Sequence, residues 1–176
     1  EFYTSLVSGG CRFEMPLEEL KKYAKQRFPK QRGSPAISLV VPHRRINAAQ
    51  NAATKTEDAI LVQGGEDGPL WLHVGLKLVG CLQGKQRGVV NGGFYTILAM
   101  GETTVRVLCE LTQKELELPW DFVKQKLRLA YAITQASCQG MTLRGRVRIY
   151  DHPRLTRRGL YVCSSRATAA DLLEFV

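Results

Sequence analysis

Residues 129–143 read Leu129-Ala-Tyr-Ala-Ile-Thr134-Gln-Ala-Ser-Cys-Gln139-Gly140-Met-Thr142-Leu143, and this stretch decides the fold. It begins with an apolar run of strand length and turns polar and small around Gly140. Apolar runs bounded by turn residues are typical of strands buried in a parallel sheet. The stretch therefore predicts a buried strand that delivers a polar loop to a sheet edge, where α/β proteins bind ligands.

Residues 160–168 repeat this plan as Leu160-Tyr-Val-Cys-Ser-Ser165-Arg166-Ala167-Thr168. The pattern predicts a short strand over Leu160–Cys163, a polar tip over Ser164–Arg166 and a helix over Ala167–Val176. An arginine at such a strand end suits a phosphate, because the guanidinium is always charged and presents its donors in one plane.

Taken together, the two stretches resemble motifs V and VI of superfamily 1 helicases, in the Pif1/RecD-like branch. The shared pattern is Ala-Ile-Thr-x-x-x-x-Gln-Gly-x-Thr-Leu, followed by Leu-Tyr-Val-x-x-Ser-Arg-Ala-Thr. The resemblance implies an α/β fold, in which a RecA-like parallel-sheet lobe (domain 2A) is interrupted by a small SH3-like β insertion (domain 2B). It also implies that the chain is the C-terminal lobe of an ATP-dependent DNA helicase that acts in DNA replication or repair.

The resemblance assigns roles to residues of both motifs. Arg166 falls on the catalytic arginine finger, which neutralises charge that develops on the γ-phosphate. Gln139 and Gly140 fall, with Arg166, on ATP-binding positions. Positions that contact nucleic acid are matched by Thr134, Ser137 and Thr142. The structural alternatives are an arginine paired with a carboxylate and a turn that simply needs a glycine.

One part of motif V departs from the family pattern Thr-x-His-Lys-Ser-Gln-Gly. The chain has Ala136 and Ser137 where that pattern has histidine and lysine. Loss of an imidazole and an ammonium weakens nucleic-acid contact or coupling, so the resemblance does not guarantee an efficient motor.

The residues before the motifs predict a helix from about Leu17 to Arg27, with Pro16 near its first position, where no backbone N–H is needed. A basic loop over residues 30–35 leads to a predicted strand over residues 36–42 and a helix from about residue 44 to 53. In the resembled lobe such a strand and helix open domain 2A, and Pro42, Ile46 and Asn47 match that outline. Candidate phosphate contacts near this junction are Lys30, Arg32, His43, Arg44 and Arg45.

Short apolar segments from residue 70 to 118 alternate with turn residues, as in a small β-meander or barrel. Val89-Val-Asn91-Gly92-Gly93 resembles the family segment that leads into the SH3-like insertion, and Asn91 is a candidate nucleic-acid contact by that match. Phe94 and Tyr95 are candidate platforms for base stacking, although strand aromatics are more often core residues.

These observations predict four segments. Residues 1–35 form an N-terminal helix and basic linker, and residues 36–74 form the first part of the RecA-like lobe. Residues 75–120 form the β insertion. The motifs lie in the second part of the lobe, residues 121–176.

A formal charge of +9 and a pI near 9.5 favour an anionic partner, since clustered lysines and arginines release counterions from a phosphate backbone. The expected partner is single-stranded DNA, and the alternative is a merely basic surface. The five cysteines have no zinc-ligand spacing, so we expect no metal site and a reducing, intracellular location, nuclear or cytoplasmic, with a viral protein as a further alternative. No apolar run approaches the ~20 residues that span a bilayer, so no membrane is expected.

The sequence carries no phosphate loop and no acidic pair for magnesium. Gly84-Lys85 is a false match, because Val79 stands where the motif needs glycine and Gln86 where it needs serine or threonine. ATP and Mg²⁺ are therefore expected to bind mainly to the N-terminal motor lobe of the same parent chain, and this chain alone is expected to be inactive. Two alternatives stay open: a non-catalytic nucleic-acid-binding or interaction module derived from a helicase lobe, and an RNA helicase lobe.

Overall fold

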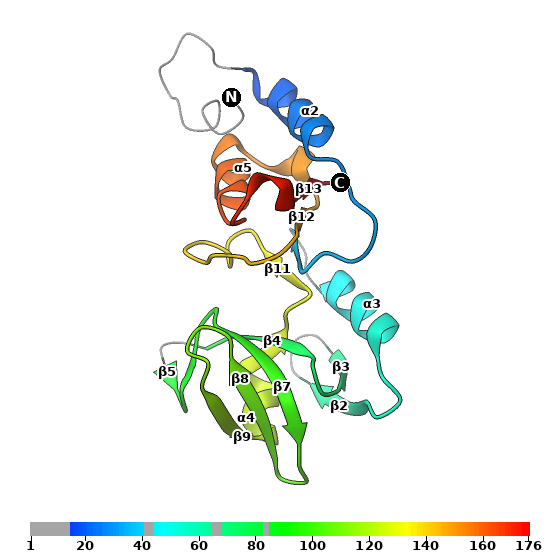
Figure 1. The fold of residues 1–176 in the computed structure, drawn as a ribbon, viewed down its shortest axis with the longest axis vertical. Coiled ribbons are helices and arrows are strands. Elements are labelled where there is room, and N and C mark those ends of the chain that lie inside the picture. Colours follow the sequence, from blue (N-terminus) through cyan, green and yellow to red (C-terminus); the bar gives the residue numbers. More distant parts are fainter. Residues whose placement is uncertain (1–14, 41–43, 65–67, 83–84) are drawn as a thin grey trace. The chain divides into compact units, whose positions relative to one another are not determined.

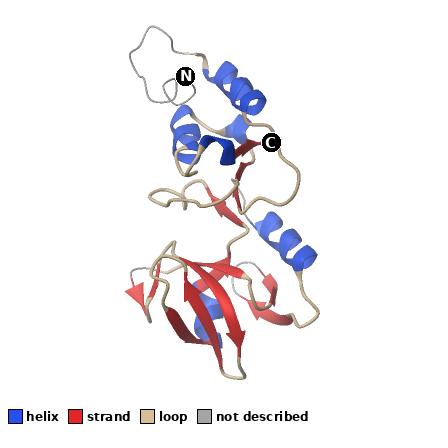
Figure 2. Cartoon of the chain, viewed as in Figure 1, coloured by secondary structure: helices blue, strands red, loops and turns tan. Residues whose placement is uncertain are grey.

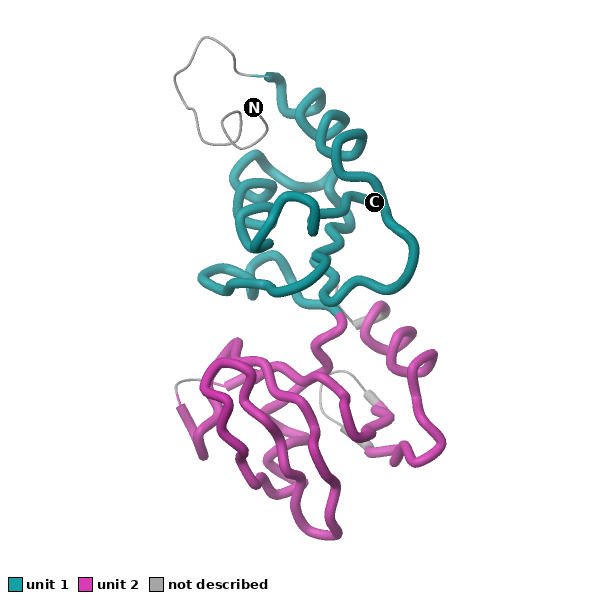
Figure 3. The backbone as a smooth tube through the Cα atoms, in the orientation of Figure 1, with its two compact units in different colours: residues 1–43, 132–176 teal, residues 44–131 magenta. Residues whose placement is uncertain are grey.

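The computed structural model describes residues 15–40, 44–64, 68–82 and 85–176, and the chain divides into two compact units (Figure 3). Unit 1 comprises residues 1–43 and 132–176, and unit 2 comprises residues 44–131. Residues 44–74 and 121–131, predicted with the α/β lobe, are thus grouped with the β-rich middle of the chain.

Unit 1 contains a four-stranded parallel sheet with the strand order β11-β1-β12-β13 (Figure 1). Its elements in chain order are α2 (Leu17–Arg27), β1 (Ile37–Val40), β11 (Ala132–Thr134), β12 (Val147–Ile149), the 3₁₀ helix η1 (His152–Arg154), α5 (Arg157–Ser164), the 3₁₀ helix η2 (Ala170–Leu172) and β13 (Leu173–Phe175). Every residue of β1, β12 and β13 is buried, as expected for parallel strands covered on both faces.

Helix α2 begins and ends where the sequence predicts, and Leu20 and Ala24 are its fully buried apolar residues. Pro16 is the N-cap, one position earlier than predicted, with extended backbone angles that a helical residue cannot have. The helix packs on η1 and β13. Beyond its end, Phe28 contacts Phe175 with ring centroids 6.2 Å apart, so the start and the end of the described chain are joined in one core.

The predicted strand over Leu160–Cys163 is wrong, because this segment belongs to helix α5 (Figure 2). Thr156 caps the helix by accepting a 3.1 Å hydrogen bond from the Gly159 N–H. Gly159, Leu160, Cys163 and Ser164 are its buried residues, and their spacing is that of one helical face. A four-residue apolar run is compatible with a strand or with a helix, and here the Thr156 cap favours the helix.

The predicted helix over Ala167–Val176 is also wrong, since the segment forms η2 and then strand β13. Glu174 pairs with Arg148 in the parallel register between β13 and β12. Burial of Leu173, Glu174 and Phe175 together with this pairing outweighs the helix propensity of leucine and glutamate.

Residues 129–134, predicted as one strand, contribute to two different sheets. Leu127–Leu129 form β10, which pairs with β4 (Lys77–Gly80), while Ala132–Thr134 form β11, which pairs with β1. The residues from 129 to 133 are all apolar or aromatic, so the sequence pattern does not mark the change of sheet at Ala130 and Tyr131.

Unit 2 contains a five-stranded antiparallel sheet with the order β10-β4-β7-β8-β9 and two small hairpins, β2-β3 and β5-β6. Its elements are α3 (Arg44–Thr54), β2 (Ile60–Gly64), β3 (Gly68–Leu72), β4 (Lys77–Gly80), β5 (Lys85–Gln86), β6 (Val89–Val90), β7 (Phe94–Met100), β8 (Thr104–Cys109), β9 (Glu115–Pro119), α4 (Trp120–Lys126) and β10 (Leu127–Leu129). Tyr95 and Ile97 are fully buried in its core. The core interpretation of Tyr95 is therefore confirmed, and Phe94 is half-buried.

Candidate functional site

The loop that follows β11, residues 135–142, is held at its start by Thr134. The Thr134 hydroxyl lies 2.8 Å from the Ser137 hydroxyl and accepts a hydrogen bond from the Ser137 N–H at 3.2 Å. The Cys138 N–H donates to the Thr134 carbonyl oxygen at 3.1 Å. Thr134 and Ser137, both half-buried, thus stabilise the turn through each other.

The tip of this 135–142 loop is open to solvent. Gln139, Gly140 and Thr142 are exposed. Gly140 has φ +81°, a conformation that glycine adopts without strain, and no atom lies within 4 Å of where its Cβ would stand. The tip therefore offers a side-chain amide, a hydroxyl and accessible backbone to a ligand, as the sequence predicts for an edge loop.

Arg166 lies just beyond the C-terminus of α5 and is half-buried. Its Nε donates to the Val162 carbonyl oxygen at 3.1 Å, and its Nη2 donates to the Ser165 hydroxyl at 2.9 Å. Its Nη1 donates to the Met141 carbonyl oxygen at 3.2 Å. No carboxylate pairs with Arg166 within the described part of the chain, so the structural alternative of an ion-paired arginine does not apply there.

The 135–142 loop and the segment after α5 are joined directly. The Leu143 N–H donates to the Arg166 carbonyl oxygen at 2.8 Å, and Leu143 forms an isolated parallel bridge with Ala167. With the Arg166–Met141 bond, these contacts bring the predicted site residues of both motifs into one region of unit 1.

The other predicted contacts lie elsewhere. Asn91 is exposed and follows β6 in unit 2, where the predicted turn leads into strand β7. Arg44 and Arg45 begin α3, which the contacts group with unit 2. His43 and the side chains of Arg44 and Arg45 lie outside the described part of the structure.

Two buried thiols, Cys138 of the loop and Cys163 of α5, form a contact that the sequence patterns do not predict. A hydrogen bond from Cys163 lowers the pKa of Cys138 below the usual thiol value, against the effect of burial, and the positive charge of Arg166 acts in the same direction. The same bond, together with burial, raises the pKa of Cys163. Cys138 Sγ also lies 3.0 Å from the Gln135 carbonyl oxygen. The pair thus connects the loop to α5.

Gln135 packs against Gly159 of α5, a second contact that sequence reasoning missed. A Cβ at Gly159 would stand 2.4 Å from Gln135 Nε2, so the absent side chain makes room for the amide. The sequence carries no signal for this contact, because Gly159 stands directly before a segment that was predicted to be a strand.

Among the described residues, no cluster of three or more His, Cys, Asp or Glu side chains has the geometry to hold a metal ion. The described helices also include none with the length and apolar character needed to cross a membrane.

Among solved structures, Pif1 helicases are similar in fold to this chain. The Pif1 helicase from Bacteroides in complex with ADP-AlF3 and single-stranded DNA matches 92% of this chain and 46% of its own, with a TM-score of 0.65 and 18% identity. Pif1 from Candida albicans matches 99% of this chain and 52% of its own, with a TM-score of 0.66 and 14% identity. A Pif1 helicase from a structure of DNA unwinding at forked duplex DNA by two coordinating Pif1 helicases matches 99% of this chain and 46% of its own, with a TM-score of 0.69 and 16% identity.

At these low identities the structural likeness shows the fold alone, and the chain spans about half the length of the solved Pif1 chains it matches. The predicted α/β fold class, a RecA-like lobe with an additional antiparallel β region, is confirmed, as is the resemblance to Pif1 helicases at the level of the fold. No protein-family model and no curated protein sequence matches the chain.

Proposed function

We propose that this chain is the C-terminal motor lobe of a Pif1-like, ATP-dependent DNA helicase. In this proposal Arg166 is the arginine finger, Gln139 and Gly140 face the nucleotide, and single-stranded DNA follows the edge formed by Thr134, Ser137 and Thr142. Asn91, His43, Arg44 and Arg45 are proposed as further DNA contacts. The N-terminal lobe of the same protein completes the motor, and the location is intracellular.

The observation that carries the proposal is the direct bond between Arg166 and the 135–142 loop. Arg166 Nη1 is held by the Met141 carbonyl oxygen, one residue from Gly140. A guanidinium fixed beside the loop can respond to a DNA strand on that loop, because displacement of Met141 moves the finger. Coupling of this kind is what a DNA-stimulated ATPase requires.

The chemistry expected of Arg166 is neutralisation of charge on a transferred phosphoryl group. Its present partners are neutral oxygens, two main-chain carbonyls and one hydroxyl, which bind a guanidinium less strongly than an anion does. A phosphate can therefore replace them. The described residues provide no carboxylate cluster for Mg²⁺, so the metal is assigned to the N-terminal lobe.

The test is steady-state ATPase activity of the full protein, with and without single-stranded DNA. Arg166→Ala is expected to reduce DNA-stimulated turnover by a factor on the order of 10³ or more. The matched control is Arg158→Ala, which removes an exposed arginine from α5, the helix before Arg166, and is expected to keep turnover within about twofold of wild type. A wild-type protein that hydrolyses no ATP would contradict the proposal.

The second candidate is a non-catalytic nucleic-acid-binding module with a retained helicase fold. The observation in its favour is that Ala136 and Ser137 replace the histidine and lysine of the family pattern. The ATPase test separates the two, because this module would bind DNA and leave ATP intact. An RNA helicase lobe, the remaining alternative, would be stimulated by RNA in place of DNA.

A further inference from the structure

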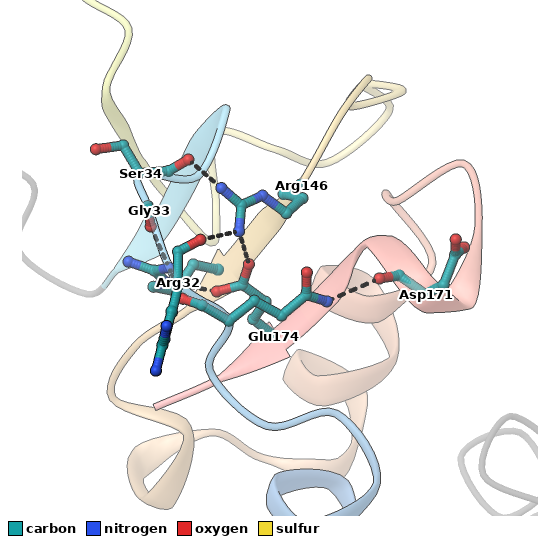
Figure 4. A network of polar contacts seen from close by, with 8 residues as sticks. Arg32, Gly33, Ser34, Arg146, Asp171 and Glu174 are labelled. Carbon is teal, nitrogen blue, oxygen red and sulfur yellow. Dashed lines mark hydrogen bonds and ion pairs between the residues drawn. The ribbon is translucent and has the colours of Figure 1, made fainter.

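A loop before β1, residues 31–34, is held in place through its carbonyl groups, and it is called the clamped loop below. Figure 4 shows Arg146 bonded to the carbonyl oxygens of Arg32 and Ser34, each at 2.7 Å. Arg148 Nη2 binds the two carbonyls that alternate with these, those of Gln31 at 3.1 Å and Gly33 at 2.9 Å. Four successive carbonyl oxygens are therefore bound by two guanidinium groups.

A buried carboxylate fixes both arginines. Glu174 is 0% exposed, and it binds Arg148 Nε at 2.7 Å and Arg146 Nη1 at 3.3 Å. Gly33 allows the loop to turn with φ +83°, and a Cβ there would stand 3.2 Å from Arg146 Nη2. The backbone of this basic loop is thus held by strands of the core sheet, unlike that of an ordinary surface loop.

Three exposed cationic side chains lie on this loop or beside it. Lys30 and Arg32 are exposed, and neither forms an ion pair in the described part of the chain. Arg144 is also exposed and unpaired there, and it belongs to the same edge because the next residue, Gly145, would place a Cβ 2.9 Å from Ala36 Cβ. One acid lies nearby, Asp171, whose carbonyl oxygen accepts a bond from Gln31 Nε2 at 3.1 Å.

Positive charge is in excess at this edge, since Lys30, Arg32, Arg144 and the two clamp arginines are five cations and the acids named beside them, Glu174 and Asp171, are two. Exposed like charges repel one another, and this cost is offset when an anionic partner releases counterions on binding. A rigid loop lowers the entropy lost in that binding, because its backbone is already ordered.

The clamped loop is separate from the site around Arg166, whereas Arg144 directly follows Leu143, whose N–H binds the Arg166 carbonyl oxygen. The clamped loop precedes β1, whereas the 135–142 loop follows β11, and the two strands are parallel with Val40 beside Thr134. The two loops therefore lie at opposite edges of the sheet. The ends of β1 are roughly 10 Å apart at about 3.3 Å per residue, which exceeds the screening length of about 8 Å at physiological salt. Lys30 and Arg32 are therefore expected to contact phosphates other than those bound near Arg166.

We propose that Lys30, Arg32 and Arg144 form a second contact for a nucleic-acid phosphate backbone, at the amino-terminal edge of the parallel sheet. The inference rests on the proposed function, which supplies the nucleic acid. Arg32 suits the role best, because a guanidinium binds two phosphate oxygens at once. The contact reads no base sequence, since phosphates carry none.

The test is fluorescence anisotropy of the full protein with two labelled probes, a single strand and a forked duplex, over a series of salt concentrations. Lys30→Ala and Arg32→Ala are each expected to reduce the slope of log Kd against log salt by roughly 0.7, and to weaken binding about fivefold at about 0.1 M salt, for at least one probe. Arg32→Lys is expected to keep the slope. Lys114→Ala, which removes an exposed lysine from unit 2, is the control and is expected to keep both values.

Each outcome decides between the claims. If the wild type binds and the Lys30→Ala/Arg32→Ala double variant binds with the same slope and Kd, this edge does not contact phosphate, while the proposed function stands. An acidic protein partner or solvent would then face the loop. If the wild type binds neither probe, the proposed function fails and this inference fails with it.

Discussion

The N–H of Leu143 donates a 2.8 Å hydrogen bond to the carbonyl oxygen of Arg166, so the two motif segments are joined through their main chains. A main-chain bond does not depend on which side chain stands at position 166. Substitution of Arg166 therefore keeps this connection, and a loss of turnover in Arg166→Ala reports the lost guanidinium more than a displaced loop.

Ser165 is a positioning residue for Arg166. Its hydroxyl accepts from Arg166 Nη2 at 2.9 Å and donates to the Val162 carbonyl oxygen at 3.2 Å. Ser165→Ala frees the guanidinium, and we expect kcat for ATP hydrolysis to fall about fivefold, which corresponds to about 1 kcal/mol, with KM nearly unchanged. Ser165→Thr keeps the hydroxyl and is expected to restore kcat. Equal kcat values for the Ala variant and the wild type would exclude the role.

Glu174 is expected to be the most costly carboxylate to neutralise. Burial by itself lowers the pKa of Arg148, yet its hydrogen bonds to Glu174 and Tyr150 raise that pKa above the ordinary arginine value. Glu174→Gln leaves two arginines beside a neutral amide, and we expect a loss of about 3 kcal/mol in the free energy of unfolding. Urea denaturation measures this.

The control for that experiment is Glu115→Gln. Glu115 pairs with Arg106 at 3.6 Å, and both side chains are 56% exposed. Because water screens such a pair, the expected loss is below about 0.5 kcal/mol. Comparable losses in the two variants would show that the Glu174 ion pairs contribute no more than a surface pair.

The parts of the fold that could be predicted are those where local signals agree. Helix α2 has its proline start, its apolar spacing and a proline beyond its end, and the Asn91 turn has glycines followed by an alternating strand. Segments decided by tertiary contacts were not predicted correctly. Leu160–Cys163 and Leu173–Phe175 are short apolar runs whose structure depends on the Thr156 cap and on pairing with β12.

For the candidate site too, local sequence signals were informative and tertiary contacts could not be predicted. Motif spacing placed Gln139 and Gly140 in a loop and Arg166 at the end of a strand, whereas the structure has Arg166 after helix α5, where it binds Met141 of that loop. Contacts between residues far apart in the sequence, such as Cys138 with Cys163 and Glu174 with Arg146, carry no periodic signal. They follow from the strand order, which a single sequence does not determine.

The contact of Gln135 with Gly159 predicts a change of sign between two backgrounds. In the wild type, Gly159→Ala forces the Gln135 amide to move, because the new Cβ would stand 2.4 Å from its nitrogen. We expect a net loss of stability there. In a Gln135→Ala background the same substitution is expected to stabilise by about 0.5–1 kcal/mol, the usual advantage of alanine over glycine in a helix. A double-mutant cycle by urea denaturation measures the coupling, and additive effects would contradict it.

Tyr95 predicts how the stability of unit 2 depends on alkaline pH. Its ring is fully buried, its hydroxyl accepts the Val90 N–H at 2.9 Å, and a Cβ at Gly93 would stand 2.7 Å from that oxygen. Burial raises the pKa of Tyr95 above its ordinary value, and the bond from Val90 opposes this only partly. The folded state therefore prefers the protonated phenol.

The sign of the effect follows from this raised pKa. The stabilisation is fully present below the unfolded-state pKa of about 10 and is lost as pH rises through the higher pKa of the folded state. The free energy of unfolding of the wild type should thus fall above about pH 10, and that of Tyr95→Phe should fall less steeply. At neutral pH, Tyr95→Phe is expected to cost about 1–2 kcal/mol, because the Val90 N–H loses its partner. Tyr161→Phe, at an exposed tyrosine, is the control and should follow the wild-type curve. Parallel curves for Tyr95→Phe and the wild type would mean that the phenol has the same pKa in the folded and unfolded states. Burial of Tyr95 would then not cause the loss of stability at alkaline pH.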